Sequence, residues 1–175
     1  SLMIAKIQGT IVDYLMPPLA PRELLFGLVM GGVTRGVVVG IAVFLAMASF
    51  VPLPMAHVGF VVFHVLASAL MLSLLGVMAA LWAEKFDQMA MVTNFVVTPL
   101  SFLSGTFYSI HDLPPGLELV ALANPFFYMI DGVRYGVTGH AEGDPLVGIG
   151  SLVIVNLALW LAALHLFRIG YRLKA

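Results

Sequence analysis

The sequence predicts an all-α protein, a polytopic bundle of hydrophobic helices that crosses a lipid bilayer several times. Of its 175 residues, 61% are hydrophobic and only 10% are charged, whereas soluble domains average about 45–50% apolar and about 25% charged residues. Long runs without a charged residue recur along the chain, the longest from Gly36 to Ala83. Because so few charges cannot form the surface of a soluble domain, we expect lipid to surround most of the chain.

The longest charge-free run is expected to hold two spans joined by a turn. As one helix it would extend about 72 Å, whereas a single span crosses about 30 Å. Pro52 and Pro54 divide the run, because proline breaks helical hydrogen bonding and disfavours helix in the residue before it. The second of the two spans should end near Trp82, an aromatic residue typical of the membrane interface.

Two more charge-free runs predict one span each, so four spans are expected. Pro99 lies inside the first of these runs and should kink it. Residues 21–23 (Pro-Arg-Glu) resemble a helix start, with proline and an acidic side chain in the first turn. The expected spans are residues 22–49, 58–82, 89–106 and 146–167.

Residues 107–144 fit neither a span nor a soluble loop. They contain two amphipathic stretches, 117–123 and 126–137, which are too short to cross a bilayer. Stretches of this length indicate re-entrant or interfacial helices. The sequence thus predicts one transmembrane domain over residues 1–175, with a non-spanning region before its last span.

Basic residues concentrate on one side of this topology, and they predict its orientation. Arg134 alone falls on the other side, while Arg35 falls inside the first span. Loops rich in Lys and Arg stay in the cytoplasm. The N-terminal segment, the connector 84–88 and the C-terminus are therefore expected to be cytoplasmic, and residues 107–144 to face outward. The basic residues on the cytoplasmic side are Lys6, Arg22, Lys85, Arg168, Arg172 and Lys174.

Residues 7–20 predict a short amphipathic helix at the cytoplasmic face. Thr10 is a plausible N-cap, with Asp13 three residues later in an approximate capping box. The basic face of a membrane-surface helix is missing. A helix lying in the head groups and a docking helix for a cytoplasmic partner both remain open, with docking slightly favoured. The apolar residues at helical spacing are Ile11, Val12, Leu15 and Met16.

Arg35 is the charged residue that fits the membrane least well. A helix starting at Arg22 would place it about 20 Å deep, where a charge is costly unless it is paired or hydrated. It belongs either to a hydrated pathway or an ion pair, or to a helix that starts later and lets it snorkel to the interface. Gly32, Gly36 and Gly40 have the spacing of close helix packing, which we favour over a hinge.

The outward segment is rich in aromatic residues, which an interfacial belt explains without a further function. Asp131 and Arg134 are three residues apart on one expected helix, so an internal ion pair is the default and a gate is the functional alternative. The aromatic residues are Phe107, Tyr108, Phe126, Phe127, Tyr128 and Tyr135.

Known catalytic and metal-binding patterns do not occur in the sequence. It has no Walker A sequence, nucleophile elbow, dinucleotide fingerprint or cysteine, and no histidine pair with metal-ligand spacing. The net charge of −1 argues against nucleic-acid binding. We therefore expect no metal, no cofactor and no enzyme activity in this chain. The alternatives are a non-catalytic scaffold of a membrane complex and, less favoured, a membrane-embedded lipid-modifying enzyme, for which His111, Asp112 and Asp131 are poor candidates.

Three segments resemble the type-2 ABC exporter permease family. Residues 7–36 resemble its cytoplasmic coupling region and the Gly-rich span that follows. Residues 97–139 resemble its Pro-bearing span, a Leu-Ser-Gly turn, a Leu-Pro turn, and an Asn-Pro pair before an amphipathic helix with Asp and Arg. The last span with its basic end also fits. Family members have six spans, so two N-terminal spans are expected to be absent from these 175 residues.

The resemblance implies a permease dimer in the bacterial inner membrane. It would bind a separate cytoplasmic ATP-binding-cassette ATPase, which would hold ATP and Mg and drive substrate outward. Substrates in the family range from drugs and lipids to polysaccharides. The implied coupling residues are Gly9, Thr10, Ile11, Val12, Asp13, Leu15, Met16 and Pro17. The implied pathway or gate candidates are Arg35, Phe95, Phe102, Tyr108, Asp131 and Arg134.

Overall fold

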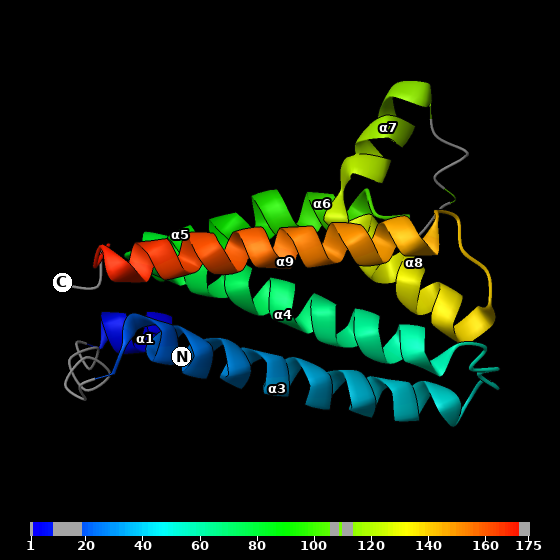
Figure 1. Ribbon diagram of the computed structural model, residues 1–175, viewed down its shortest axis with the longest axis horizontal. Helices are drawn as coiled ribbons and strands as arrows, with labels where there is room; N and C mark the ends of the chain where they lie inside the picture. Colours follow the sequence, from blue (N-terminus) through cyan, green and yellow to red (C-terminus); the bar gives the residue numbers. More distant parts are fainter. Residues whose placement is uncertain (1, 9–18, 106–108, 110–113, 172–175) are drawn as a thin grey trace.

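A computed structural model describes residues 2–8, 19–105, 109 and 114–171, and the elements in these ranges are all helical. Figure 1 shows long helices running side by side, with α7 projecting from one end of the bundle. The elements in chain order are α1 (Leu2–Ile7), α3 (Pro21–Ala48), α4 (Val58–Trp82), α5 (Phe86–Val92), the π-helical turn η1 (Thr93–Val97), α6 (Thr98–Phe102), α7 (Pro115–Ala123), α8 (Pro125–Thr138) and α9 (Pro145–Arg168).

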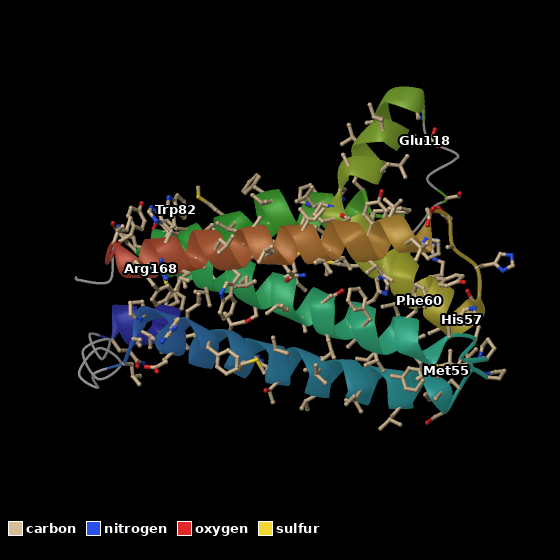
Figure 2. All side chains as sticks on the ribbon, in the orientation of Figure 1. Met55, His57, Phe60, Trp82, Glu118 and Arg168 are labelled. Atoms are coloured by element: carbon tan, nitrogen blue, oxygen red, sulfur yellow. The ribbon has the colours of Figure 1, made fainter. Side chains whose placement is uncertain are left out.

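Three of these helices, α3, α4 and α9, are long and apolar enough to cross a membrane. The predicted all-α membrane fold is confirmed to this extent. The three helices begin and end within one residue of the expected spans 22–49, 58–82 and 146–167. Their outward-facing side chains are mostly apolar (Figure 2), as lipid contact requires.

The expected span 89–106 has a different structure. The helical run here covers residues 86–102, and its hydrogen-bonding pattern changes in the middle, where η1 joins α5 to α6. The backbone N–H of Thr98 and its hydroxyl both donate to the carbonyl of Thr93, the hydroxyl over 2.9 Å. This wider turn directly precedes Pro99, which has no N–H and whose ring crowds the carbonyl four residues earlier. The expected distortion therefore takes the form of a π turn, and a fourth span remains a prediction.

Polar side chains and glycines set the helix contacts inside the bundle. The Ser73 hydroxyl of α4 donates to the Val29 carbonyl of α3 over 2.9 Å, and Gly32 lies directly against Ser73. Gly36 lies against Ala69, whereas the space around Gly40 is open. The glycine-spacing prediction is therefore right for two of its three residues. Around these contacts α3, α4 and α9 share a core of Leu25, Val29, Leu74, Leu81, Ala163 and Phe167.

The two ends of the bundle differ in charge. Arg22, Lys85 and Arg168 are at or next to the ends of α3, α5 and α9 on one side, while α8 with Arg134 lies at the other (Figure 1). At that second end the turn after α3 binds α8: the N–H groups of Ala56 and His57 donate to the carbonyls of Val137 and Gly136. The α3–α4 turn and the end of α8 are thus one unit.

Candidate functional site

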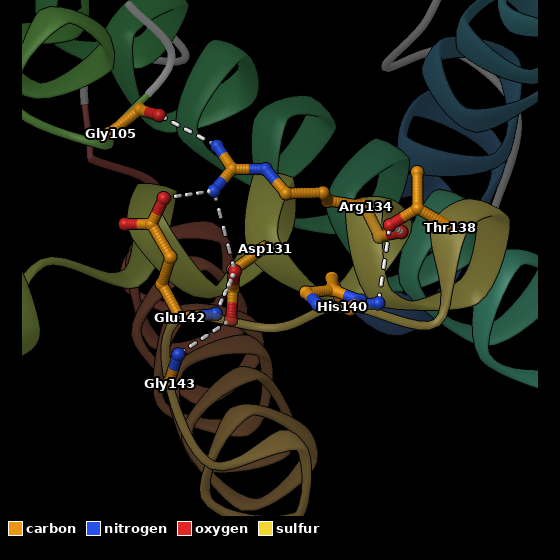
Figure 3. Close-up of polar contacts among 7 residues, drawn as sticks. All are labelled: Gly105, Asp131, Arg134, Thr138, His140, Glu142 and Gly143. Carbon is orange, nitrogen blue, oxygen red and sulfur yellow. Dashed lines mark hydrogen bonds and ion pairs between the residues drawn. The ribbon is translucent and has the colours of Figure 1, made fainter. Parts of the chain in front are cut away.

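A polar cluster around Arg134 joins three segments at the α8 end of the bundle (Figure 3). Its guanidinium donates to the Glu142 carboxylate and to the Gly105 carbonyl, both over 2.7 Å. Asp131 is nearly buried, and its carboxylate accepts the backbone N–H groups of Glu142 and Gly143 over 2.9 and 3.0 Å. The cluster therefore ties the end of α6 and the α8–α9 loop to α8.

The predicted ion pair between Asp131 and Arg134 is present, but it is the weaker of two. Their closest atoms are 3.8 Å apart, against 2.7 Å for Arg134 and Glu142. The Arg134 side chain is 28% exposed and that of Asp131 only 5%. Asp131 thus fixes the loop backbone, whereas Arg134 and Glu142 form a partly exposed bridge.

Asn124 is a second tie between α6 and α8, and it explains the Asn-Pro pair. Its side-chain oxygen accepts the N–H of Phe126 over 3.0 Å and caps α8, while its amide donates to the Leu100 carbonyl over 2.7 Å. Pro125 follows at the first helical position, where its missing N–H costs nothing. One buried side chain thus starts α8 and binds it to α6.

Glycines on α8 and α9 make room for a buried histidine of α4. A Cβ at Gly132 would collide with the His64 ring, and one at Gly136 would lie 2.8 Å from the backbone nitrogen of Val61. Gly148 of α9 faces the same ring. The ring is fully buried; its Nδ1 is 2.9 Å from the Phe60 carbonyl, and its Nε2 has no partner among the described residues. α8 therefore packs against α4 with a short distance between the two backbones.

Aromatic rings complete the contact between α4 and α8. The rings of His57 and Tyr135 stack with centroids 4.8 Å apart, and Phe60 meets Tyr135 edge-on at 4.9 Å.

Burial raises the pKa of the Tyr128 hydroxyl, and the negative charges of Asp131 and Asp144 raise it further. Tyr128 is therefore neutral at physiological pH.

Two apolar grooves run along the described helices. One, of about 440 Å³, lies between α4 and α9 beside Asn156 and Trp160. The other, of about 340 Å³, lies among α4, η1, α8 and α9. Neither has the converging polar groups of a catalytic pocket. Among the described residues no group of three His, Cys, Asp or Glu side chains could hold a metal ion.

The sequence-predicted site residues fall into separate regions. The coupling residues 9–13 and 15–17, and Tyr108, lie outside the described residues. Phe95 and Phe102 are 78% and 55% exposed on the η1–α6 surface, and Asp131 and Arg134 meet in the cluster described above. Arg35 lies on α3, which starts at Pro21, so the alternative of a later helix start is wrong.

Sequence reasoning missed several partners of these residues. Asn124 before a proline was a readable N-cap signal, but its bond to Leu100 was not. Gly105 and Glu142 join the Arg134 cluster through loop geometry, for which the sequence has no periodic signal. Gly132 and Gly136 have the same small-xxx-small spacing as the glycines of the first span. The close contact of α8 with α4 could therefore have been predicted from the sequence.

The helices and their apolar surfaces define a multi-pass membrane protein. The chain matches the family described as "ABC-2 type transporter" over residues 1–138, and it belongs to this family. It is 36% identical to the "Inner membrane transport permease YadH" of Escherichia coli over 171 residues, which cover 98% of the chain and 67% of the relative.

A more distant likeness is to the "Nodulation protein J" of Neorhizobium galegae. The identity is 27% over 108 residues, or 61% of the chain and 41% of that protein. No solved structure gives a significant match to the chain.

Proposed function

We propose that this chain forms most of the membrane domain of an export permease in the bacterial inner membrane. The family match and the three membrane-length helices carry the proposal. The name of the Escherichia coli relative supports a permease of the inner membrane. Basic residues at one end of the bundle favour a cytoplasmic location for that end, with both chain termini on the same side.

Coupling to ATP is assigned to the segment that includes Gly9–Pro17. It connects α1 to α3, and both Lys6 and Arg22 flank it. An ATPase subunit on the cytoplasmic side would bind this segment. It would also bind ATP and Mg and supply the catalytic residues, so that the permease needs none. The apolar side chains Val12 and Met16 are the proposed contacts.

The cargo pathway is assigned to the surface of α5, η1 and α6, which in this proposal form a fourth span and face a second permease copy. Phe95 and Phe102 are large, apolar and exposed there. The apolar side chain of Leu119, on α7 at the outer end of this surface, is also exposed, at 71%. We assign α7 and α8 to a re-entrant cap over the outer exit, fastened by the Arg134 cluster.

Adding a charge at Val12 tests the coupling assignment. Val12→Glu should lose binding of the ATPase subunit and ATP-dependent transport, because a carboxylate in an apolar groove is poorly solvated. Ile169→Glu is the matched control, since Ile169 is exposed just beyond α9 at the same end. The assay is co-purification of the complex with its ATPase activity. Intact ATPase binding in Val12→Glu, at wild-type hydrolysis rates, would refute the coupling role.

A further inference from the structure

Arg35 lies at the middle of α3 and level with the middle of α4, the two helices whose lengths suit a membrane span. It is fourteen residues from the start of α3 and thirteen from its end, about 20 Å from either. The contacts of Gly32 with Ser73 and of Gly36 with Ala69 place it level with residues 69–73 of α4. The midpoint of α4, between Val58 and Trp82, is residue 70. Both helices therefore put Arg35 near the bilayer centre.

The guanidinium of Arg35 is exposed there, and no described side chain or carbonyl binds it. A bare cation at this depth is strongly disfavoured, so acceptors must reach it in the assembled protein. The sequence cannot supply a carboxylate at this level, because no Asp or Glu occurs in residues 24–83, 88–111 or 145–175. Since no described Asn, Ser or Thr side chain of these helices binds the guanidinium either, we look for its acceptors outside them.

The surface around Arg35 has the shape of a helix-packing face. Gly27 and Gly31 lie on the same side of α3, away from α4, and a Cβ at either would meet nothing within 4 Å. Side chains lean toward the helix N-terminus, so Arg35 extends over Gly31, one turn earlier. The other glycine pair of α3, Gly32 and Gly36, is occupied by α4. One glycine pair of α3 thus contacts another helix, and the other contacts none among the described residues.

We propose that the Gly27–Gly31–Arg35 face of α3 packs against a further membrane-spanning helix, and that this helix presents oxygen acceptors to the guanidinium. The acceptors are a carboxylate or the oxygens of Asn, Gln, Ser or Thr side chains at mid-membrane depth. The glycines let the two backbones approach closely, which brings short acceptor side chains within reach of Arg35.

Two other occupants fit this face less well. Lipid phosphates lie about 15 Å from the bilayer centre, and an extended arginine side chain covers roughly half of that distance. Symmetric packing of α3 on α3 of a second copy would bring two Arg35 cations together without a counter-charge. Of these three occupants, a polar helix is the one that supplies acceptors at the right depth.

Photo-crosslinking in the full permease, purified into phospholipid nanodiscs together with any subunit that accompanies it, tests the proposal. Benzoylphenylalanine replaces Val38, one turn beyond Arg35 on the same face. The control position is Val43, which is similarly exposed (53% against 60%) but lies about 140° around the helix. We expect Val38 to crosslink to a peptide of a membrane-spanning helix other than α4. Val43 lies two turns beyond Gly36, on the side of α3 that faces α4, and should crosslink to α4 or to lipid. Adding Arg35→Leu should reduce the Val38 peptide adduct about fivefold or more.

Lipid adducts alone at Val38, or a peptide adduct that Arg35→Leu leaves unchanged, would overturn the proposal. Thermal stability of the same purified permease is the second measurement. Gly31→Leu should lower the unfolding temperature by several degrees, while Gly40→Leu, at another open glycine of α3, should not. Equal behaviour of the two would also overturn it. Neither readout involves export, so failure of the proposed function leaves this test intact.

Discussion

Arg134 joins two loops at the α8 end of the bundle. Its planar guanidinium donates to a carboxylate and a backbone carbonyl that belong to different loops. Lysine carries the same charge, but it cannot reproduce the fixed fork of donors. The geometry of the side chain, and not only its charge, is therefore needed here.

Arg134→Lys should destabilise the protein by about 1.5–3 kcal/mol, the contribution of a hydrogen bond to a charged group. The Gly105 carbonyl or the Glu142 carboxylate loses its donor. Unfolding in SDS mixed micelles measures the change. Arg22→Lys, an exposed arginine at the other end, is the control and should change stability by less than about 0.5 kcal/mol. A loss shared equally by both variants contradicts the role of the cluster.

Residue-scale interactions were only partly predictable from the sequence. The i,i+3 spacing of Asp131 and Arg134 predicted their pairing, because helical periodicity is local. The closer partner, Glu142, lies eight residues away across the end of α8. Its position depends on the left-handed backbone of Gly139 and on the following loop, which no repeat in the sequence encodes.

At the scale of elements, the contact of α8 with α4 depends on missing side chains. Gly132 and Gly136 are one turn apart and both allow α4 to approach closely. The two differ in what they face: a side-chain ring at Gly132, and both a Val61 methyl group and backbone atoms at Gly136. This difference allows a test with an internal rescue.

Gly132→Ala should cost about 1–3 kcal/mol, because the new methyl group overlaps the His64 ring in a packed core. Adding His64→Ala should recover part of the loss by removing the ring. Gly136→Ala faces the Val61 backbone, which no side-chain truncation relieves. Gly150→Ala is the control, since a Cβ there meets nothing within 4 Å. SDS unfolding is the measurement, and a neutral Gly132→Ala would show that α8 is seated differently.

The long helices were predictable because local signals mark their ends. Pro21 starts α3, the Pro52–Pro54 turn separates it from α4, and Pro145 starts α9 after a capping Asp144. The π turn was not predictable, although Pro99 signalled a distortion. Whether a helix adds a residue or bends at a proline depends on the neighbouring packing, which the sequence does not display.

At the scale of the whole molecule, most of the described basic residues at helix ends lie at one end of the bundle, which predicts the orientation of the protein in the membrane. If residues 107–144 face outward, a cysteine at Ser109 should react with a membrane-impermeant maleimide from outside intact cells. A cysteine at Gln88 should react only after the membrane is opened. The 175 residues contain no cysteine, so each probe is clean within this chain. Labelling of both positions from the same side would overturn the four-span topology.

The bonds that fasten α6 to α8 also bear on how this region varies in evolution. The hydrogen bond between the Asn124 amide and the Leu100 carbonyl joins residues 24 positions apart, and Arg134 binds Gly105, which lies between them. Lengthening a loop whose ends are already held costs little, about 0.6 kcal/mol for each doubling. We expect homologous proteins to differ in length between Gly105 and Pro114 and to keep constant length between Asn124 and Gly143. Two glycine–serine residues inserted after Ser109 should leave the SDS unfolding midpoint nearly unchanged, whereas the same insertion after Thr138 should lower it.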